Sequence, residues 1–257
     1  DGLCFDYTAS PSIPMQFWHD IIRQLKNLKP EMEFLSKADI SDSINHNLNP
    51  CSFDFDCASG FQQQLAQRFG REQTQADSLR TICEQLLRAS STVMNHRMVS
   101  IAATDKLTAS PSQTLEALYG DNRYNMTVLL FTVYGIPVIS QEEVKQSDIM
   151  MQNTIQTLIA LHHTQSDLAF DAPITFLPTS DPQVLAYQRG AVVVVLNLGN
   201  AEAHANVIDI NAGKYDKWLD SRTLPDGPSV SHAELSSSRS IALDAHGFAV
   251  YVACEDN

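Results

Sequence analysis

The sequence predicts an α/β fold that is followed by an antiparallel β module. Apolar strands alternate with amphipathic helices up to about residue 166, a pattern typical of a parallel sheet covered by helices. From residue 167 onwards, short β-rich runs are separated by Gly, Asn, Pro and Ser, and no long helical pattern occurs. We therefore expect two domains, residues 1–166 and residues 167–257.

Helices in the first part are predicted from apolar residues that recur three or four positions apart. The segment FWHDIIRQLKNLKP (17–30) places its apolar residues on one face and ends at Pro30. Trp18 lies within this apolar face, which favours a structural role for its ring over contact with a ligand. Further helices are expected at 61–69, 75–88, 112–120, 123–135 and 148–163.

Strands in the first part are predicted at 1–7, 33–37, 97–103 and 136–140, with a further strand near Phe53. A closed (β/α)8 barrel needs about 250 residues, so the first part is too short to form one by itself. It predicts a sheet of four or five parallel strands. In the second part, strands are expected at 184–189, 191–199, 206–210, 239–245 and 248–253.

The charge of the chain limits its partners. The formal net charge is −13 over 257 residues, and such a surface repels phosphate backbones and anionic lipid. We therefore expect no nucleic-acid partner. No run of about 18 apolar residues is present, so we expect no membrane span. An extracytoplasmic location is slightly favoured.

The cysteines and acidic pairs give no metal or cofactor signal. The spacing of the five cysteines matches no zinc pattern, so we interpret them as buried thiols, with a Cys51–Cys57 bridge as the alternative. Asp54 and Asp56 alone offer too few oxygen ligands for calcium. We expect no metal site and no cofactor.

Four strand-end segments carry the functional signal. DGLCFDYTA (1–9) places Asp6 directly after an apolar run, and PEMEFLSKADI (30–40) places Lys37 after the next one. MVSIAATDKL (98–107) contains Asp105, and YGIPVISQEEV (134–144) contains Glu143. They are followed by TIQTLIALHHTQSDLAF (154–170) and VLAYQRGAVVVVLNLGN (184–200).

In this order, the six segments resemble the α-amylase superfamily, glycoside hydrolase family 13. The resemblance covers the second half of that family's catalytic barrel and its C-terminal β domain. It implies the C-terminal half of a (β/α)8 TIM barrel at 1–166 and an antiparallel β-sandwich at 167–257. A half-barrel has unpaired strand edges and an exposed apolar interior, so we expect a second chain that completes the barrel.

The resemblance also assigns roles to individual residues. Asp6 falls on the nucleophile and Asp105 on the carboxylate that stabilises the transition state. Lys37 stands in the place of the general acid Glu. At the substrate-binding positions, Cys4 replaces an Arg, Thr104 replaces a His, and Glu143 matches the family pattern.

The chemistry of a retaining glycosidase needs two carboxyl groups about 5–5.5 Å apart, one as nucleophile and one as acid. An ammonium at Lys37 would be held charged by Asp6 and would be a poor proton donor. Asp39 is the alternative acid if the alignment of the strand slips by two residues.

Three functional interpretations follow from these substitutions. The first is a glycoside hydrolase homologue with a degraded catalytic set, a pseudoenzyme that binds an α-glucan or oligosaccharide or assists assembly with little or no hydrolysis. The second is an active retaining α-glucosidic hydrolase completed by a missing N-terminal half. The third is a non-enzymatic structural subunit of a larger complex.

Overall fold

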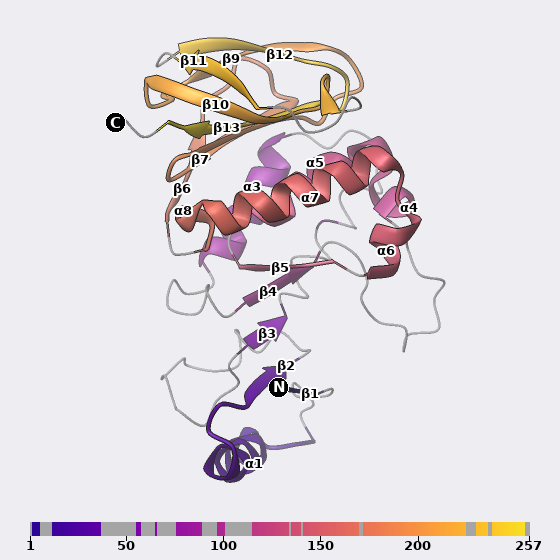
Figure 1. Cartoon of the computed structure of the whole chain (residues 1–257), viewed down its shortest axis with the longest axis vertical. Coiled ribbons are helices and arrows are strands. Elements are labelled where there is room, and N and C mark those ends of the chain that lie inside the picture. Colours follow the sequence, from indigo (N-terminus) through magenta and orange to yellow (C-terminus); the bar gives the residue numbers. More distant parts are fainter. Residues whose placement is uncertain are drawn as a thin grey trace.

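The computed structural model combines a parallel sheet, a layer of helices and an antiparallel β region (Figure 1). It describes residues 2–5, 12–36, 55–57, 65, 76–88, 97–100, 115–133, 135–139, 141–169, 172–224, 230–235 and 238–254. Within these residues, no helix is both long enough and apolar enough to cross a membrane.

The first part contains a five-stranded parallel sheet in which sequence order and spatial order coincide. This confirms the predicted strands, including the one near Phe53. The strands are β1 (Gly2–Phe5), β2 (Glu33–Ser36), β3 (Phe55–Cys57), β4 (Arg97–Ser100) and β5 (Ile136–Val138). Because all five run in the same direction, their carboxyl ends meet at one edge of the sheet.

Helices connect the strands and separate the parallel sheet from the β region. Those predicted at 17–30, 75–88, 112–120, 123–135 and 148–163 are confirmed, and Leu65 is helical within the range predicted at 61–69. A short helix after β5 was not predicted. The helices are α1 (Met15–Leu28), α3 (Ala76–Arg88), α4 (Leu115–Tyr119), α5 (Arg123–Thr132), α6 (Gln141–Gln146), α7 (Ile149–Thr164) and α8 (Ser166–Ala169), with a 3-10 turn η2 (Gly120–Asn122).

Helix α1 packs on the first strands through aromatic rings. Trp18 is buried, and its ring centroid lies 5.2 Å from that of Phe5 in β1. Phe5 in turn stacks on Phe34 of β2 at 6.2 Å. These contacts support the structural role predicted for Trp18.

The second part is antiparallel, as predicted. A six-stranded sheet has the order β11-β10-β13-β8-β7-β6, and a separate two-stranded sheet joins β12 to β9. Strands β6, β10 and β11 were not predicted. The bounds are β6 (Ile174–Leu177), β7 (Val184–Arg189), β8 (Val192–Asn197), β9 (Ala203–Ile208), β10 (Gly213–Asp220), β11 (Ser231–Leu235), β12 (Ser238–Leu243) and β13 (Phe248–Ala253).

The six-stranded sheet is buried on both faces at its centre. Val192 and Val194 of β8 belong to the same core as the helices, whereas Val193 and Val195 pack with β9 and β12. Side chains alternate between the two faces of a strand, so a strand covered on both sides reads as a continuous apolar run. This explains the sequence AVVVV.

Arg189, at the end of β7, connects this sheet to the end of α5. It is 2% exposed, and its guanidinium donates to the carbonyls of Val133 (2.7 Å), Thr132 (3.4 Å) and Ala172 (3.3 Å). The last carbonyls of a helix have no partner within the helix and carry partial negative charge. A buried cation at this position satisfies them and fixes the angle between α5 and β7.

We expect Arg189→Met to lower the free energy of unfolding by about 2–4 kcal/mol, because each buried carbonyl left without a donor costs about 1–3 kcal/mol. Arg23→Met is the matched control, since Arg23 pairs with Asp20 on the surface of α1 with 58% of its side chain exposed. Its effect should stay below about 1 kcal/mol. Equal losses in chemical denaturation would contradict the assigned role of Arg189.

The β7–β8 turn depends on glycine for two separate reasons. Gly190 has φ +55°, and a Cβ added there would overlap the Asp167 carboxylate, which accepts a 2.7 Å hydrogen bond from the Ala191 N–H. Gly120 has the same φ, but an added Cβ would meet nothing within 4 Å. A side chain would therefore strain the backbone at both positions, and it would also be crowded at Gly190.

We expect Gly120→Ala to cost about 1–2 kcal/mol of stability, the penalty for a left-handed backbone with a side chain. Gly190→Ala should cost at least about 1 kcal/mol more, because Asp167 must move and give up its backbone hydrogen bond. Urea denaturation of the two variants measures the difference. Equal costs would show that Asp167 does not restrict the turn.

Candidate functional site

The carboxyl edge of the parallel sheet is the candidate site. Strand β1 ends at Phe5 and β2 ends at Ser36, and these two residues are register partners in neighbouring strands. Asp6 and Lys37 are therefore the first residues after two adjacent strands.

Several predicted site residues lie outside the part of the chain that the structure describes. These are Asp6, Lys37, Thr104 and Asp105, together with Asp39, the alternative acid. The backbone of Cys4 lies in β1 opposite Leu35, and its side chain is not described. The assignments for these residues remain predictions.

Glu143 is the one predicted site residue whose side-chain contacts are described. It lies in α6, shortly after β5, and its carboxylate accepts a 2.9 Å hydrogen bond from the N–H of Leu115. Leu115 begins α4, where backbone N–H groups have no partner within the helix. Glu143 therefore links α6 to the start of α4 through a hydrogen bond. The sequence did not predict this contact.

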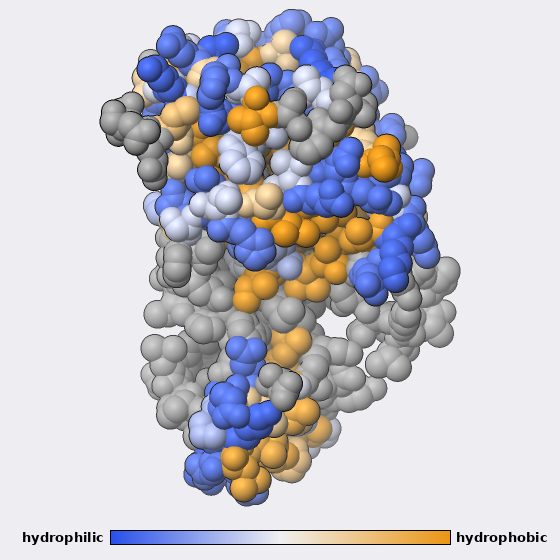
Figure 2. All heavy atoms as spheres, viewed as in Figure 1, coloured by the Kyte–Doolittle hydropathy of each residue, from blue (hydrophilic) through white to orange (hydrophobic). Residues whose placement is uncertain are grey.

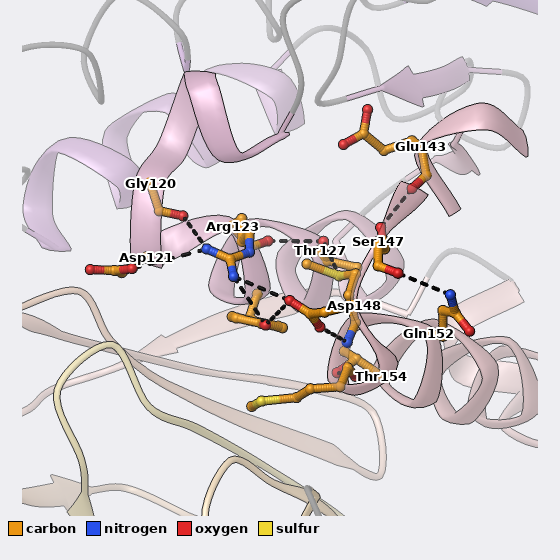
Figure 3. A network of polar contacts seen from close by, with 12 residues as sticks. Gly120, Asp121, Arg123, Thr127, Glu143, Ser147, Asp148, Gln152 and Thr154 are labelled. Carbon is orange, nitrogen blue, oxygen red and sulfur yellow. Dashed lines mark hydrogen bonds and ion pairs between the residues drawn. The ribbon is translucent and has the colours of Figure 1, made fainter. Parts of the chain in front are cut away.

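Polar contacts connect Glu143 to the start of α7 (Figure 3). The hydroxyl of Ser147 donates to the Glu143 carbonyl at 2.6 Å, and the amide of Gln152 donates to the Ser147 carbonyl at 2.9 Å. Asp148, which follows Ser147 in the sequence, is the N-cap of α7, and its carboxylate accepts a hydrogen bond from the Met151 N–H at 2.8 Å. The turn between α6 and α7 is thus hydrogen-bonded to both helices.

Asp148 also joins α7 to α5 (Figure 3). Its second oxygen accepts from the Tyr124 hydroxyl at 2.7 Å and from the Arg123 guanidinium at 3.2 Å. Partial burial works against ionisation of this carboxyl, but hydrogen bonds from the Met151 N–H, Tyr124 and Arg123 outweigh it and lower the pKa. Asp148 is therefore a negative charge that stabilises the packing of two helices.

A polar cleft that the sequence did not predict lies between η2 and the antiparallel sheet. It has a volume of about 350 Å³, and none of the predicted site residues lines it. Its wall includes Tyr119, Asn122, Asp181, Gln183, Glu202 and His246. The sequence gives no indication of this cleft, because these residues come from four distant segments.

The acids of this cleft are already engaged. Asp181 accepts from the backbone N–H of Gln183 at 2.8 Å, and Glu202 accepts from Arg222 at 3.1 Å. The Nδ1 atom of His246 is buried and has no hydrogen-bond partner among the described residues. The cleft thus offers hydrogen-bonding groups to a polar ligand but no pair of carboxyls poised for hydrolysis.

Asp148→Asn tests the charge at the α5–α7 contact, because asparagine keeps the N-cap and removes the charge. A lowered pKa in the folded state adds stability above the unfolded pKa of about 3.9. At neutral pH, wild type should be more stable by up to about 1 kcal/mol, since a carboxyl this exposed is screened by solvent. The difference should shrink as pH falls below about 3.9 and vanish once pH is below the lowered pKa that Asp148 has in the folded state.

The matched control is Asp121→Asn, a carboxylate 79% exposed and 4.0 Å from the same Arg123. Its stability difference should be close to zero across the pH range. Chemical denaturation at neutral and acidic pH compares the two variants. A constant difference for Asp148→Asn at every pH would contradict the electrostatic role.

Comparison with known proteins gives matches by structure alone. No protein family matches the sequence, and no curated protein matches it. The structure is similar to the Nostoc punctiforme debranching enzyme soaked with acarbose, with a TM-score of 0.73 and 16% identity over 98% of this chain and 57% of that one. It is also similar to the α-amylase of Geobacillus thermoleovorans complexed with acarbose, with a TM-score of 0.72 and 14% identity over 100% of this chain and 60% of that one.

A third similar structure is the α-amylase of Malbranchea cinnamomea, with a TM-score of 0.71 and 16% identity over 98% of this chain and 56% of that one. The chain thus spans less than two thirds of the length of each of these three structures. At such low identities the similarity shows the fold alone. The chain has a fold shared with α-amylases and a debranching enzyme, as the strand-end segments predicted.

Proposed function

We propose that the chain is an α-amylase-like glycoside hydrolase homologue that binds an α-glucan or oligosaccharide and has little or no hydrolytic activity. In this proposal, residues 1–166 are the second half of a (β/α)8 barrel and residues 167–257 are a β-sandwich domain. The proposal combines the shared fold with the residues at the carboxyl ends of the parallel strands.

The observation that carries the proposal is the placement of Asp6 and Lys37. They directly follow β1 and β2, whose last residues Phe5 and Ser36 are register partners. A nucleophile and an acid at the ends of adjacent strands would suit a retaining glycosidase. Here a lysine takes the place of the acid, and Cys4 takes the place of the arginine that orients the nucleophile.

The consequence for rate follows from general acid catalysis. Asp6 would keep the Lys37 ammonium protonated, so Lys37 would not donate a proton to the departing glycosidic oxygen. Loss of a general acid costs about 10²–10⁴ in rate. Binding is less affected, because hydroxyl recognition does not require proton transfer.

Two retained carboxylates support a second candidate, an active α-glucosidic hydrolase. Asp6 occupies the proposed nucleophile position and Asp105 the stabiliser position, so a substrate that needs no acid could still react. Activity on natural glucans would require a carboxyl from elsewhere, such as Asp39 or a residue of the missing barrel half. If neither binding nor turnover occurs, a structural subunit is the remaining candidate.

Apolar side chains at the outer end of the parallel sheet support completion of the barrel by further protein. Leu3 of edge strand β1 is 41% exposed, and Phe17 and Leu28 of α1 are 49% and 83% exposed. Figure 2 shows apolar surface at this end of the molecule, around α1. We propose that a second chain or a further segment of the same polypeptide covers it.

The decisive experiment compares two substrates in the complete protein that carries this chain. An aryl α-glucoside with a good leaving group needs no acid, whereas a natural α-glucan does. We expect slow turnover of the aryl glucoside, no detectable turnover of the glucan, and measurable binding of acarbose by calorimetry. Asp6→Asn should abolish the turnover and leave acarbose binding detectable.

The matched control is Asp20→Asn, which removes an exposed carboxylate on α1 and should leave turnover unchanged. Glucan hydrolysis at a rate similar to that of the aryl glucoside would establish a working acid and overturn the proposal. Absence of both turnover and acarbose binding would overturn both carbohydrate candidates.

A further inference from the structure

Three side chains with metal-ligating atoms meet on one face of the antiparallel sheet. Asp216 lies in β10, His232 lies in β11, and Cys254 directly follows β13. Their carboxylate oxygen, imidazole nitrogen and thiol sulfur all lie within 4.8 Å of one another. The group is independent of the strand-end site and of its proposed function.

Strand register explains why these residues converge. Asp216 is the direct antiparallel partner of His232, which places the two side chains on the same face. On the other side, Tyr215 pairs with Ala253, so Cys254 lies diagonally across from Asp216 on that face. The backbone N–H of Cys254 also bonds to the Lys214 carbonyl at 2.9 Å, which continues the ladder and fixes the position of the cysteine.

One of the two distances from Asp216 to the other ligands suits a small tetrahedral ion, and the other has to widen. The Asp216 oxygen lies 2.5 Å from Nδ1 of His232 and 3.5 Å from Sγ of Cys254. Bonds of about 2.0–2.3 Å to Zn²⁺ require ligand atoms roughly 3.3–3.8 Å apart. The Asp216–Cys254 distance fits this spacing, whereas the Asp216–His232 distance must widen through rotation of the His232 side chain, which is 91% exposed.

Ligand chemistry selects the type of metal. A mixture of thiolate, imidazole and one carboxylate favours Zn²⁺ over Ca²⁺ and Mg²⁺, which prefer oxygen ligands alone. The neighbouring charges are balanced, since Lys214 and Glu234 are direct register partners beside the group. A hollow lined by His232, Glu234 and Cys254 opens above it, which leaves space for a water molecule as the fourth ligand.

We propose that Asp216, His232 and Cys254 form a Zn²⁺-binding site with its fourth position open to water. Binding replaces the Asp216–His232 hydrogen bond with metal bonds from both residues. Nδ1 of His232 gives up its proton to solvent and Nε2 takes up a proton, so the imidazole binds zinc as its neutral Nε2-protonated tautomer. The thiol of Cys254 loses its proton to solvent as the thiolate bonds to zinc. Two adjacent strands hold Asp216 and His232, and Cys254 directly follows a third; rigid elements position metal ligands more precisely than loops do.

Calorimetry with Zn²⁺ alone tests the site in the complete protein without a histidine tag. We expect the wild-type protein to bind one Zn²⁺ ion at this site. Asp216→Asn, His232→Gln and Cys254→Ser should each lower the Zn²⁺ affinity by about tenfold to hundredfold or more, since even the loss of an outer-shell contact has that effect. Circular dichroism checks that the variants stay folded, and their surface location favours this.

Co²⁺ substitution provides a second readout that is specific for the thiolate. Bound Co²⁺ should give a sulfur-to-cobalt charge-transfer band that Cys254→Ser removes. His204→Gln is the matched control, because Nε2 of His204 lies 3.3 Å from the Glu202 carboxylate on the exposed surface of β9, and the side chain is 67% exposed. This pair has no cysteine among its described contacts, and the variant should leave Zn²⁺ affinity and the band unchanged.

Three results would overturn the proposal. The first is Zn²⁺ affinity that is unchanged in Asp216→Asn and His232→Gln. The second is a charge-transfer band that survives Cys254→Ser, because another cysteine would then be the ligand. The third is an equal loss of affinity in His204→Gln and His232→Gln, which would indicate only weak binding to exposed histidine–carboxylate pairs.

Discussion

Burial of β8 on both faces is the constraint on which the rest of the structure depends. Val192 and Val194 contribute to the core that contains α3, α5 and α7, while Val193 and Val195 contribute to the core beneath β9 and β12. One face of β8 is buried only when the helices pack against it, and the other only when β9 and β12 do. The helices and the antiparallel region therefore stabilise one another, although the sequence assigns them to different parts of the chain.

This coupling extends to the parallel sheet through α5 and α7. Arg189 at the end of β7 binds the last carbonyls of α5, and the buried hydroxyls of Tyr187 and Thr132 share a 2.5 Å hydrogen bond beside it. From α5, the Arg123–Asp148 contact leads to α7, and α5 also contacts β5. The β5 side of the parallel sheet is thus linked to the antiparallel region, and Figure 1 shows β1 at the far end from that link.

The spacing of apolar residues was sufficient to predict helices and strands whose apolar pattern is regular. The apolar stripe of 17–30 correctly indicated a helix, and the apolar run within 191–199 correctly indicated a strand. Strand β10, GKYDKWLD, was missed because its exposed and half-buried polar residues are more numerous than its buried Tyr215 and Leu219. Helix α6 was missed because its six residues carry a mostly polar sequence.

The site was less predictable than the fold, because it depends on contacts between distant residues. The resemblance marked Glu143 as a substrate-binding position, but no local pattern reveals its hydrogen bond to Leu115, twenty-eight residues earlier. The Asp216, His232 and Cys254 group could not be found from cysteine and histidine spacing. Its members converge only when β10 lies between β11 and β13.

The contacts that maintain the fold are separate from the positions at which catalysis is proposed to be lost. Among the described residues, Glu143, Asp148 and Arg189 hold helices and strands together through contacts with α4, α5 and α7. In a working glycosidase, two neighbouring carboxyls repel each other and cost stability, a common trade-off between activity and stability. A lysine in the proposed place of the acid would attract the aspartate instead of repelling it. The proposed loss of the acid is therefore compatible with the framework that the described residues show. That framework argues for shared architecture, and the strand-end residues decide whether hydrolysis survives.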